Sequence, residues 1–339
     1  MNAKVKFLVT GAAGFIGSNL VAALVSRGER VRALDNLATG FWENLDGIPD
    51  QSKIERITAD IRDASALAEA MQGVEVCFHQ GALGSVPKSV AFPVESTSVN
   101  VVGTTTVLDV ARHQGVRRVI FAASSSAYGE TEELPKRETM PTMPLSPYAI
   151  TKVTGELSLK VFASIYGLET LSLRYFNVFG PNQSPDGAYA AAIPKFVNQA
   201  LDGQAIHLFG DGKQTRDFSF VKNTVTANLL AADCSKKLSG EIVNIAGERR
   251  VELLGLVEEI GRRLAQSTQG SPPVEVIHDP PRAGDIRHSL GDITRARELL
   301  GFAPLVRWEE GLPSTIEYLR TLRKEGRSAA SAVMSKLWA

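Results

Sequence analysis

The sequence predicts an α/β protein whose core is a doubly wound parallel sheet. Over the first half of the 339 residues, short β-branched runs alternate with segments of helical periodicity. This alternation is typical of parallel strands joined by right-handed helical crossovers. A glycine-rich stretch lies directly between the first strand pattern and the first helix pattern, and the charged fraction is that of an ordinary globular chain.

The elements expected in this half follow one another at short intervals. Expected strands are Lys6–Thr10, Val31–Asp35, Ile54–Thr58, Val74–His79, Val119–Ala123 and Thr170–Arg174. Expected helices are Ile16–Arg27, Ala64–Met71, Val101–Gln114 and a long helix from Pro147 to about Tyr166.

The pattern of alternating strands and helices becomes less regular at about Phe179. Pro, Gly and Asp cluster at Gly180–Gly187, Gly210–Gly212 and Ser271–Gly284, between short helical and strand patterns. We therefore expect residues 1–178, joined by some later segments, to form the sheet domain, and residues 179–325 to form a smaller lobe that closes over a ligand. Residues 326–339 are small, polar and weakly patterned, and we expect a loosely held tail there.

Composition and charge argue against a nucleic-acid-binding protein, a membrane protein and a secreted protein. Lys plus Arg and Asp plus Glu number 37 each, so no global charge draws the chain to nucleic acid or to an anionic membrane. No segment approaches ~20 uninterrupted apolar residues, and the first apolar run ends at Gly11, too early for a signal peptide. We expect a soluble cytoplasmic protein without a metal site, with Cys77 and Cys234 as free thiols.

The glycine-rich stretch predicts a dinucleotide site. In Thr10-Gly11-Ala12-Ala13-Gly14-Phe15-Ile16-Gly17, the first glycine allows the tight turn, the second lets a pyrophosphate approach the backbone, and the third lets the helix pack on the strand. The helix N-terminus offers free amides to the phosphates. Asp35 ends the second strand 18 residues after Gly17, where a carboxylate accepts hydrogen bonds from ribose hydroxyls and repels a 2′-phosphate. NAD is therefore favoured over NADP.

Three further polar segments are candidate ligand contacts, and two of them lie at the carboxyl ends of strands, where doubly wound sheets bind ligands. Asp60-Ile61 follows the third strand, Gln80-Gly81-Ala82 follows the fourth, and Asn100 precedes a helix. We interpret Asp60, Ile61, Gln80, Ala82 and Asn100 as cofactor contacts, although each could be a turn or capping residue.

A tyrosine and a lysine point to proton-transfer chemistry. Tyr148 and Lys152 are spaced i, i+4 at the start of the long helix, so both side chains lie on one helical face. A nearby cation and a positively charged nicotinamide favour phenolate, which would make Tyr148 a usable base. Ser124, Ser125 and Ser126 end the fifth strand, where a hydroxyl can bridge a substrate oxygen and Tyr148. Taken alone, Tyr148 and Lys152 could be an ordinary surface pair, and the three serines could form a polar turn.

Together these motifs resemble the extended short-chain dehydrogenase/reductase family, which has a Rossmann sheet, and within it the UDP-hexose 4-epimerases. The similarity runs from about Lys6 to Leu319 and includes Asp60-Ile61, His79-Gln80-Gly81-Ala82, Ser124 ahead of Tyr128-Gly129, and the run from Arg174 to Pro181. The order of residues around Gln80 departs from that of many relatives, so its role is open.

The resemblance implies a role for each matching residue. Ser124, Tyr148 and Lys152 would be catalytic, and Asn177 would contact the substrate diphosphate. Arg216 and Arg282 resemble the arginines that clamp the nucleotide, and Asp285 would bind its ribose. Further expected cofactor contacts are Phe15, Ile16, Asn36, Gly40 and Tyr175, together with Tyr148 and Lys152 themselves. Further expected substrate contacts are Ser85, Ser125, Ser126 and Ser289. The resemblance also implies a homodimer.

A few positions separate the activities within this family. Dehydratases typically carry Asp-Glu after the catalytic hydroxyl, and sugar-acid decarboxylases a Glu, whereas this chain has Ser125 and Ser126. We therefore predict inversion at C4 of a UDP-sugar through a 4-keto intermediate. Leu83–Pro87 and Ser289, which replaces a bulky aromatic of many relatives, favour UDP-GlcNAc and UDP-GalNAc. UDP-glucose/UDP-galactose, UDP-glucuronate and CDP- or GDP-sugar epimerases stay open, and the intact catalytic residues argue against a silent NAD-binding regulator.

Overall fold

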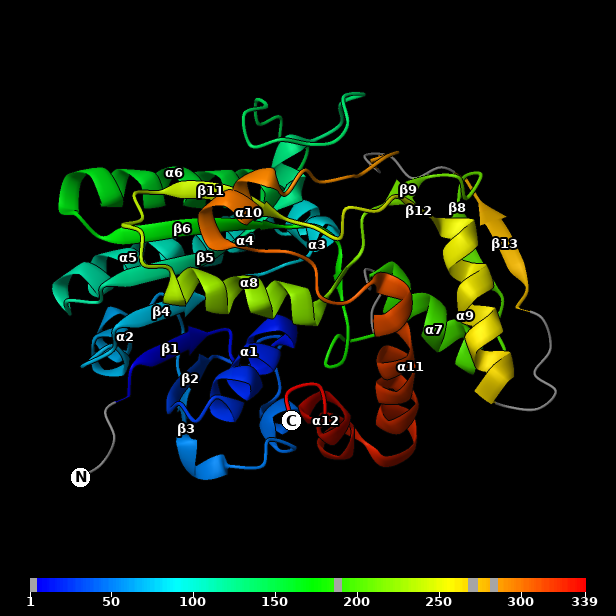
Figure 1. Cartoon of the computed structure of the whole chain (residues 1–339), viewed down its shortest axis with the longest axis horizontal. Helices are drawn as coiled ribbons and strands as arrows, with labels where there is room; N and C mark the ends of the chain where they lie inside the picture. The colour runs from blue at the N-terminus through cyan, green and yellow to red at the C-terminus, as the bar shows by residue number, and fades with distance from the viewer. Residues whose placement is uncertain (1–4, 186–190, 268–273, 281–285) are drawn as a thin grey trace.

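A computed structural model describes residues 5–185, 191–267, 274–280 and 286–339 of the chain. Its centre is a seven-stranded sheet in the order β11-β6-β5-β4-β1-β2-β3, with every neighbouring pair parallel (Figure 1). The strands are β1 (Phe7–Thr10), β2 (Val31–Asp35), β3 (Ile54–Thr58), β4 (Val76–His79), β5 (Arg118–Ser124), β6 (Glu169–Tyr175) and β11 (Glu241–Ile245). The predicted doubly wound α/β class is confirmed.

Helices cover both faces of the sheet, as the chirality of parallel crossovers requires. One face carries α1 (Phe15–Ser26) and α8 (Val221–Asp233); the other carries α2 (Ala64–Ala70), α5 (Gly103–His113) and α6 (Pro147–Tyr166). The central strands between these layers are mostly buried, and all four residues of β4 are buried, whereas the edge strand β3 has exposed residues. The observed strands and helices begin and end within two residues of the predicted bounds.

The expected helix Val101–Gln114 is preceded by short helices that were not predicted from the sequence. The helical turns α3 (Val86–Ala91) and α4 (Pro93–Thr97) lead into a π-helical turn at Ser98–Val102, and only then does α5 begin. Two prolines at first helical turns, Pro87 and Pro93, were the signal for these short helices.

A second group of elements lies at the carboxyl end of the sheet (Figure 1). It comprises α7 (Ala192–Leu201), α9 (Leu253–Ser267), α11 (Trp308–Glu325) and the paired strands β8 (Ile206–Phe209) with β13 (Val276–Asp279), β7 (Val178–Phe179) with β10 (Ser219–Phe220), and β9 (Thr215–Arg216) with β12 (Val251–Glu252). Helix α10 (Thr294–Leu300) packs on β11. The domain division at residue 178 stays a prediction.

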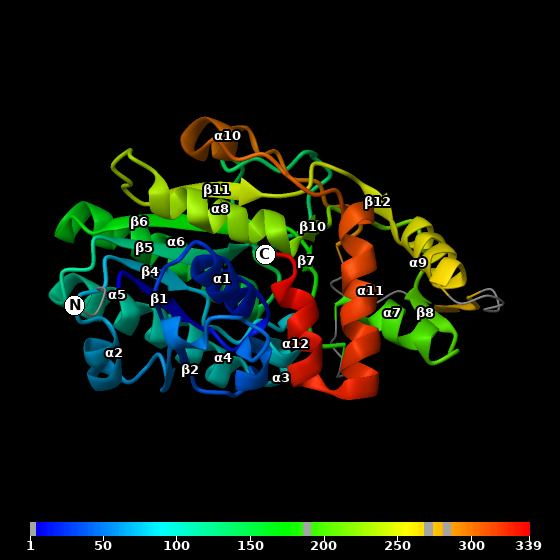
Figure 2. The same cartoon turned by 60° about the horizontal axis from the view of Figure 1, so that its bottom comes forward.

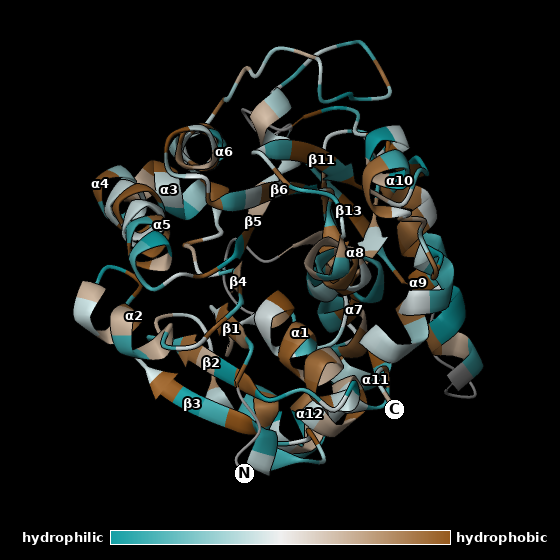
Figure 3. Cartoon of the chain, turned by 60° about the vertical axis from the view of Figure 1, so that its left-hand side comes forward, coloured by the Kyte–Doolittle hydropathy of each residue, from teal (hydrophilic) through white to brown (hydrophobic). Residues whose placement is uncertain are grey.

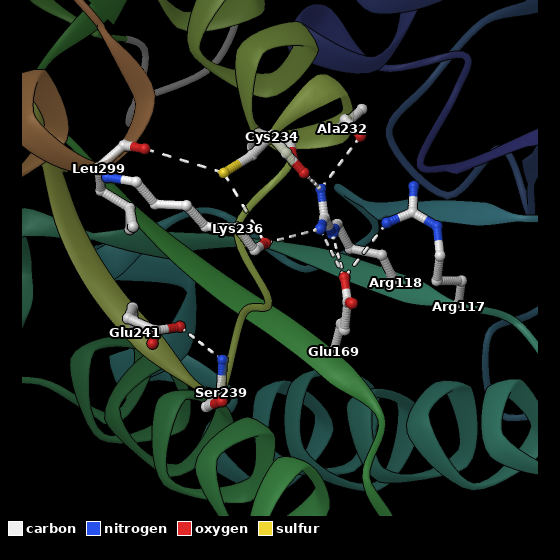
Figure 4. Close-up of polar contacts among 10 residues, drawn as sticks. Arg117, Arg118, Glu169, Ala232, Cys234, Lys236, Ser239, Glu241 and Leu299 are labelled. Atoms are coloured by element: carbon white, nitrogen blue, oxygen red, sulfur yellow. Dashed lines mark hydrogen bonds and ion pairs between the residues drawn. The ribbon is translucent and has the colours of Figure 1, made fainter.

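The amino end of the sheet is tied to α8 by Arg118, which is 1% exposed (Figure 4). Its Nε donates to Glu169 at 2.8 Å, and its Nη1 donates to the carbonyls of Ala231, Ala232 and Cys234. These carbonyls end α8 and have no partner within the helix, so a cation stabilises them and the negative end of the helix dipole. Cys234 and the buried Cys77 are free thiols.

The last helix, α12 (Arg327–Ser335), contradicts the expectation of a loosely held tail. Ala330, Val333 and Met334 are buried in the core shared with α1, and α12 packs against α11 and the 3-10 turn η1 (Trp42–Leu45) (Figure 2). The segment looked weakly patterned because the helix has only nine residues and most of them are small or polar. Within the described parts of the chain, no helix is long and apolar enough to span a bilayer.

One flank of the molecule leaves apolar side chains exposed. Helices α3, α4, α5 and α6 cluster there (Figure 3). Their exposed residues are Val90, Phe92, Val94, Val102, Ile150, Leu157, Val161, Ile165 and Tyr166. On α6 the spacing of Leu157, Val161 and Ile165 places three of them in one row.

We predict that this flank is the interface of a homodimer with twofold symmetry. Light scattering at micromolar concentration should give twice the chain mass, and Leu157→Glu should shift the mass toward the monomer because it buries a charge in the interface. Leu305→Glu is the matched control, since Leu305 is similarly exposed outside this flank. A monomeric mass for the unaltered protein would overturn the prediction.

Candidate active site

The glycine-rich loop between β1 and α1 has no room for side chains. Gly11 has φ +67°, and a Cβ there would lie 2.7 Å from the Cα of Gly81, which follows β4. A Cβ on Gly17 would lie 2.0 Å from the Gly11 carbonyl oxygen. The loop therefore packs directly on the end of β4. The amides of Ala12, Ala13 and Gly14 donate to Leu34, Asp35 and Gly11, so the amides left to bind a phosphate group are those of the first turn of α1.

Asp35 connects the end of β2 to this loop. Its Oδ2 accepts the Ala13 amide at 3.0 Å and its Oδ1 accepts the Leu37 amide at 2.8 Å. Burial raises the pKa of the Asp35 carboxyl, and the two backbone bonds lower it. Nearby, Asn36 donates to Asp60, and Arg62 pairs with Asp60 at 2.8 Å and holds the pKa of that carboxyl far below its usual range.

A cavity of about 450 Å³ runs along the carboxyl ends of β1, β2 and β4. Thirteen predicted cofactor residues line it: Gly11, Gly14, Phe15, Ile16, Gly17, Asp35, Asn36, Ile61, Gln80, Ala82, Tyr148, Lys152 and Tyr175. Gly40, Asp60 and Asn100 instead support its walls. Lining residues that the sequence did not single out include Ala38, Thr39, Arg62 and Glu95; Arg62 could have been found from its place two residues after Asp60.

Asn100 is buried and acts as a bridge rather than a helix cap. Its side chain accepts the Leu83 amide, donates to the Leu83 carbonyl and donates to Thr151 Oγ1 at 3.0 Å. It thereby fixes the loop after β4 to the residue that precedes Lys152.

A closed ring of three side chains gives Gln80 its structural role. Gln80 Nε2 donates to Asn228 Oδ1 at 3.1 Å, Asn228 Nδ2 donates to the Tyr175 hydroxyl at 2.8 Å, and that hydroxyl donates to Gln80 Oε1 at 3.2 Å. Burial raises the pKa of Tyr175 to about 12, so the phenol stays protonated and holds the ring. Asn228 lies within α8, where nothing in the sequence distinguished it.

A second cavity, of about 380 Å³, adjoins the first and shares Tyr148 and Tyr175 with it. Its walls contain the predicted residues Ser124, Ser125, Ser126, Asn177, Arg216 and Ser289. Ser85 instead caps α3 by accepting the Lys88 amide. Arg282 and Asp285 lie outside the described residues.

The hydroxyl of Ser124 is oriented by its neighbour Ser126. Both the amide and the Oγ of Ser126 donate to Ser124 Oγ, the latter at 2.9 Å. With its oxygen accepting twice, Ser124 has its own proton left to donate. Burial raises the pKa of Tyr148, and a hydrogen bond between the Ser124 and Tyr148 side chains opposes this rise.

Lys152 lies farther from the phenol than the helical spacing suggested. Its Nζ donates to the Ala122 carbonyl at 2.7 Å and lies 5.8 Å from the centre of the Tyr148 ring. Burial lowers the pKa of Lys152 to about 8, although the carboxylate of Glu156, one turn later, opposes this. Burial also raises the pKa of Tyr148, so the expected lowering by Lys152 does not dominate in the protein alone.

Glu156 is held by a buried ion pair beneath the site. Arg174 donates to both of its carboxylate oxygens at 2.7 Å, and each side chain is 2% exposed. The guanidinium also lies 4.6 Å from the centre of the Tyr128 ring, which lines the second cavity. This bidentate pair fixes α6 to β6.

A third cavity, of about 260 Å³, continues from the second and shares Asn177, Val178 and Arg216 with it. Phe179, Phe196, Phe209 and Phe218 give it aromatic walls. Asn177 has φ +29° and donates to the carbonyl of Asp217, and Asp217 itself accepts the amides of Gly247 and Gly291. The three cavities thus form one path past Tyr148, ending in a cationic and aromatic pocket. In the described residues, no cluster of three or more His, Cys, Asp or Glu could hold a metal ion.

Comparison with known proteins agrees with this geometry. Residues 7–246 match the model of the NAD dependent epimerase/dehydratase family. The chain belongs to that family. It is 40% identical to a UDP-glucose 4-epimerase of Mycolicibacterium smegmatis, over 92% of this chain and 98% of the relative.

Solved structures of family members superpose on the whole fold. A UDP-N-acetylglucosamine 4-epimerase from Methanobrevibacter ruminantium, in complex with UDP-N-acetylmuramic acid, has a TM-score of 0.87 at 36% identity and covers 95% of this chain and 99% of its own. A Thermus thermophilus UDP-glucose 4-epimerase in complex with NAD has a TM-score of 0.82 at 33% identity, covering 93% and 99%. The predicted family and NAD cofactor are confirmed, while the individual site roles stay predictions.

We predict that Tyr148→Phe abolishes most turnover. The substitution keeps the ring but removes the oxygen that would accept a proton, so the rate should fall by ~10² or more with the fold intact. Steady-state kinetics and circular dichroism measure the two effects. Tyr166→Phe, at an exposed position on the same helix, should leave the rate unchanged. Near-normal turnover by Tyr148→Phe would mean that the base is elsewhere.

We predict that Lys152→Met lowers activity at neutral pH but raises the stability of the folded protein there. Without the cation the phenolate forms less readily, so the activity optimum moves to higher pH. Because burial holds the lysine pKa near 8, below its usual 10.5, the unfolded chain binds more protons between these values. The native lysine therefore costs stability below pH 8, and this cost disappears as the pH rises toward 10.5.

Thermal melts of the NAD-free proteins should then show Lys152→Met to be more stable at pH 7, by on the order of 3 kcal/mol, with the two curves converging at high pH. A variant that is less stable at pH 7 would show that the hydrogen bond to Ala122 outweighs the cost of burying the charge.

Proposed function

We propose that this chain inverts C4 of UDP-N-acetylhexosamines, interconverting UDP-GlcNAc and UDP-GalNAc. The observation that carries this substrate choice is the position of Ser289, whose small side chain lies in the wall of the cavity that also contains Ser124 and Tyr148. A 2-acetamido group adds several heavy atoms to the sugar, and a large residue at this position would compete with it for space.

The backbone around Ser289 is fixed from two directions. Its amide donates to the Thr215 carbonyl at 3.1 Å, and the amide of Gly291 donates to Asp217 at 3.0 Å. The Thr215 carbonyl that receives the Ser289 amide belongs to β9, next to Arg216. The side chain at position 289 can therefore change the width of the cavity while its own backbone stays in place.

The chemistry we propose uses three side chains of this site. Tyr148 takes the proton of the sugar 4-hydroxyl, and Ser124, whose proton is free to donate, stabilises the phenolate oxygen. Lys152 adds a buried positive charge. NAD, when bound, supplies a hydride acceptor that returns the hydride within one turnover. The 4-keto sugar must then turn in the second cavity, so that Tyr148 returns the proton to a product of inverted configuration.

The third cavity would hold the nucleotide. Its aromatic walls suit a base, while Asn177 and Arg216, at the junction with the second cavity, suit the diphosphate. This assignment places the sugar between the diphosphate and Tyr148.

Two alternative substrates have support among the relatives. The Mycolicibacterium smegmatis relative is a UDP-glucose 4-epimerase, and a similar structure from Bacillus cereus is a UDP-glucuronic acid 4-epimerase at 29% identity. A panel of UDP-sugars incubated with the protein, with the C4 configuration read by NMR, distinguishes all three.

We predict that Ser289→Tyr suppresses turnover of UDP-GlcNAc and UDP-GalNAc but spares UDP-Glc and UDP-Gal. Forced overpacking commonly costs ~1–3 kcal/mol, which corresponds to roughly ten- to a hundredfold in kcat/KM. Ser289→Ala is the control, because it keeps the cavity open and should retain the acetamido sugars. Equal losses on both substrate types would make Ser289 merely structural, and a preference of the unaltered enzyme for UDP-Gal would overturn the proposed substrate.

A further inference from the structure

The helix α12 packs against a segment that is hydrogen-bonded to the glycine-rich loop. This segment, residues 40–47, includes η1 and is called here the brace. Two groups of the brace bind the same loop atom: the Phe41 amide donates to the Ala13 carbonyl at 3.0 Å, and Asn44 Nδ2 donates to it at 2.7 Å. Gly40 packs so closely that a Cβ there would lie 2.8 Å from the Ala13 carbonyl carbon.

The other end of the brace is fastened to α12. The Gly47 amide donates to Ser331 Oγ at 2.6 Å, and Ser328 Oγ donates to Asp46 at 2.8 Å. A Cβ on Gly47 would lie 2.4 Å from the Ser331 carbonyl carbon, so the two backbones are in direct contact. Ser331 is fully buried.

Arg327, the first residue of α12, reaches the brace by a second route. Its guanidinium lies 4.0 Å from the centre of the Phe41 ring, and its Nη1 donates to Asn44 Oδ1 at 3.5 Å. The Asn44 side chain thus connects α12 to Ala13 through its two ends. Asp35 holds the amide of Ala13, so the peptide groups on both sides of that residue are fixed.

We propose that α12 positions the glycine-rich loop for NAD, with Ser331 and Gly47 as positioning residues that act through Asn44 and Phe41. The amides at the start of α1 can meet a pyrophosphate only if the loop before them keeps its shape, and the Ala13 carbonyl is held by the brace rather than by a helix or strand. Retention of NAD between turnovers therefore depends on a helix whose Ser331 lies 284 residues after Gly47 in the sequence.

Two variants test the proposal by NAD binding, without reference to the sugar substrate. Ser331→Ala leaves the Gly47 amide without its acceptor, and Gly47→Ala forces the brace and α12 apart. The amount of NAD that copurifies with the protein is measured, followed by the Kd for NAD added back, by titration calorimetry. We expect the Kd to rise about three- to tenfold for Ser331→Ala and by more for Gly47→Ala.

Matched controls separate this role from general stability. Ser335→Ala removes a hydroxyl from the same helix that has no hydrogen-bond partner, and Gly255→Ala adds a Cβ with nothing within 4 Å. Both should retain NAD as the unaltered protein does. At saturating NAD, Ser331→Ala should also keep the kcat and the KM for the UDP-sugar.

A Kd for NAD in Ser331→Ala equal to that of Ser335→Ala would overturn the proposal, even if the melting temperature falls, because α12 would then only cover the core. If Gly47→Ala does not fold, Ser331→Ala alone decides, since it adds no volume to the contact.

Discussion

The structure depends on the direct contact between two backbones at the centre of the sheet. Gly11 and Gly81 follow β1 and β4, the neighbouring strands at which the sheet reverses its direction of winding, and no side chain fits between them. The helices after these strands lie on opposite faces, which leaves the crevice where doubly wound sheets bind their ligands. Every other part of the site is arranged around this crevice: Asp35 from β2, the ring through Gln80 from β4, and Tyr148 with Lys152 from α6.

The charge states of Tyr148 and Lys152 also depend on how far the fold buries them. Lys152 is buried and Tyr148 is partly buried, and burial disfavours the charged form of each side chain. A phenolate there needs a compensating positive charge and a hydrogen-bond donor. The family's cofactor brings the charge, and Ser124, with its oxygen already occupied by Ser126, brings the donor. The protein without its cofactor thus holds the base in its protonated form.

What the sequence could predict was mostly local. The glycine loop, Asp35 and the pair Tyr148/Lys152 each belong to a short motif whose spacing matches one turn or one strand end, and the structure brings them to one cavity. Asn228 and Arg118 could not be found in this way. Each is a polar residue inside an otherwise ordinary element, and its partner lies far away in the chain. The tail shows the same limit, because α12 has only nine residues, most of them small, and the contact of Ser331 with the bare backbone of Gly47 leaves no periodic signal in the sequence.

The main-chain anchoring of residue 289 has a consequence for how such enzymes diverge. Its amide is bound to β9, and two residues later the chain is held by the buried Asp217. A single codon change at this position would then alter the room available to a sugar substituent without repacking the surrounding loops. Under the proposed function, duplicated genes acquire new sugar preferences by such single steps while Tyr148 and Lys152 on α6 stay unchanged.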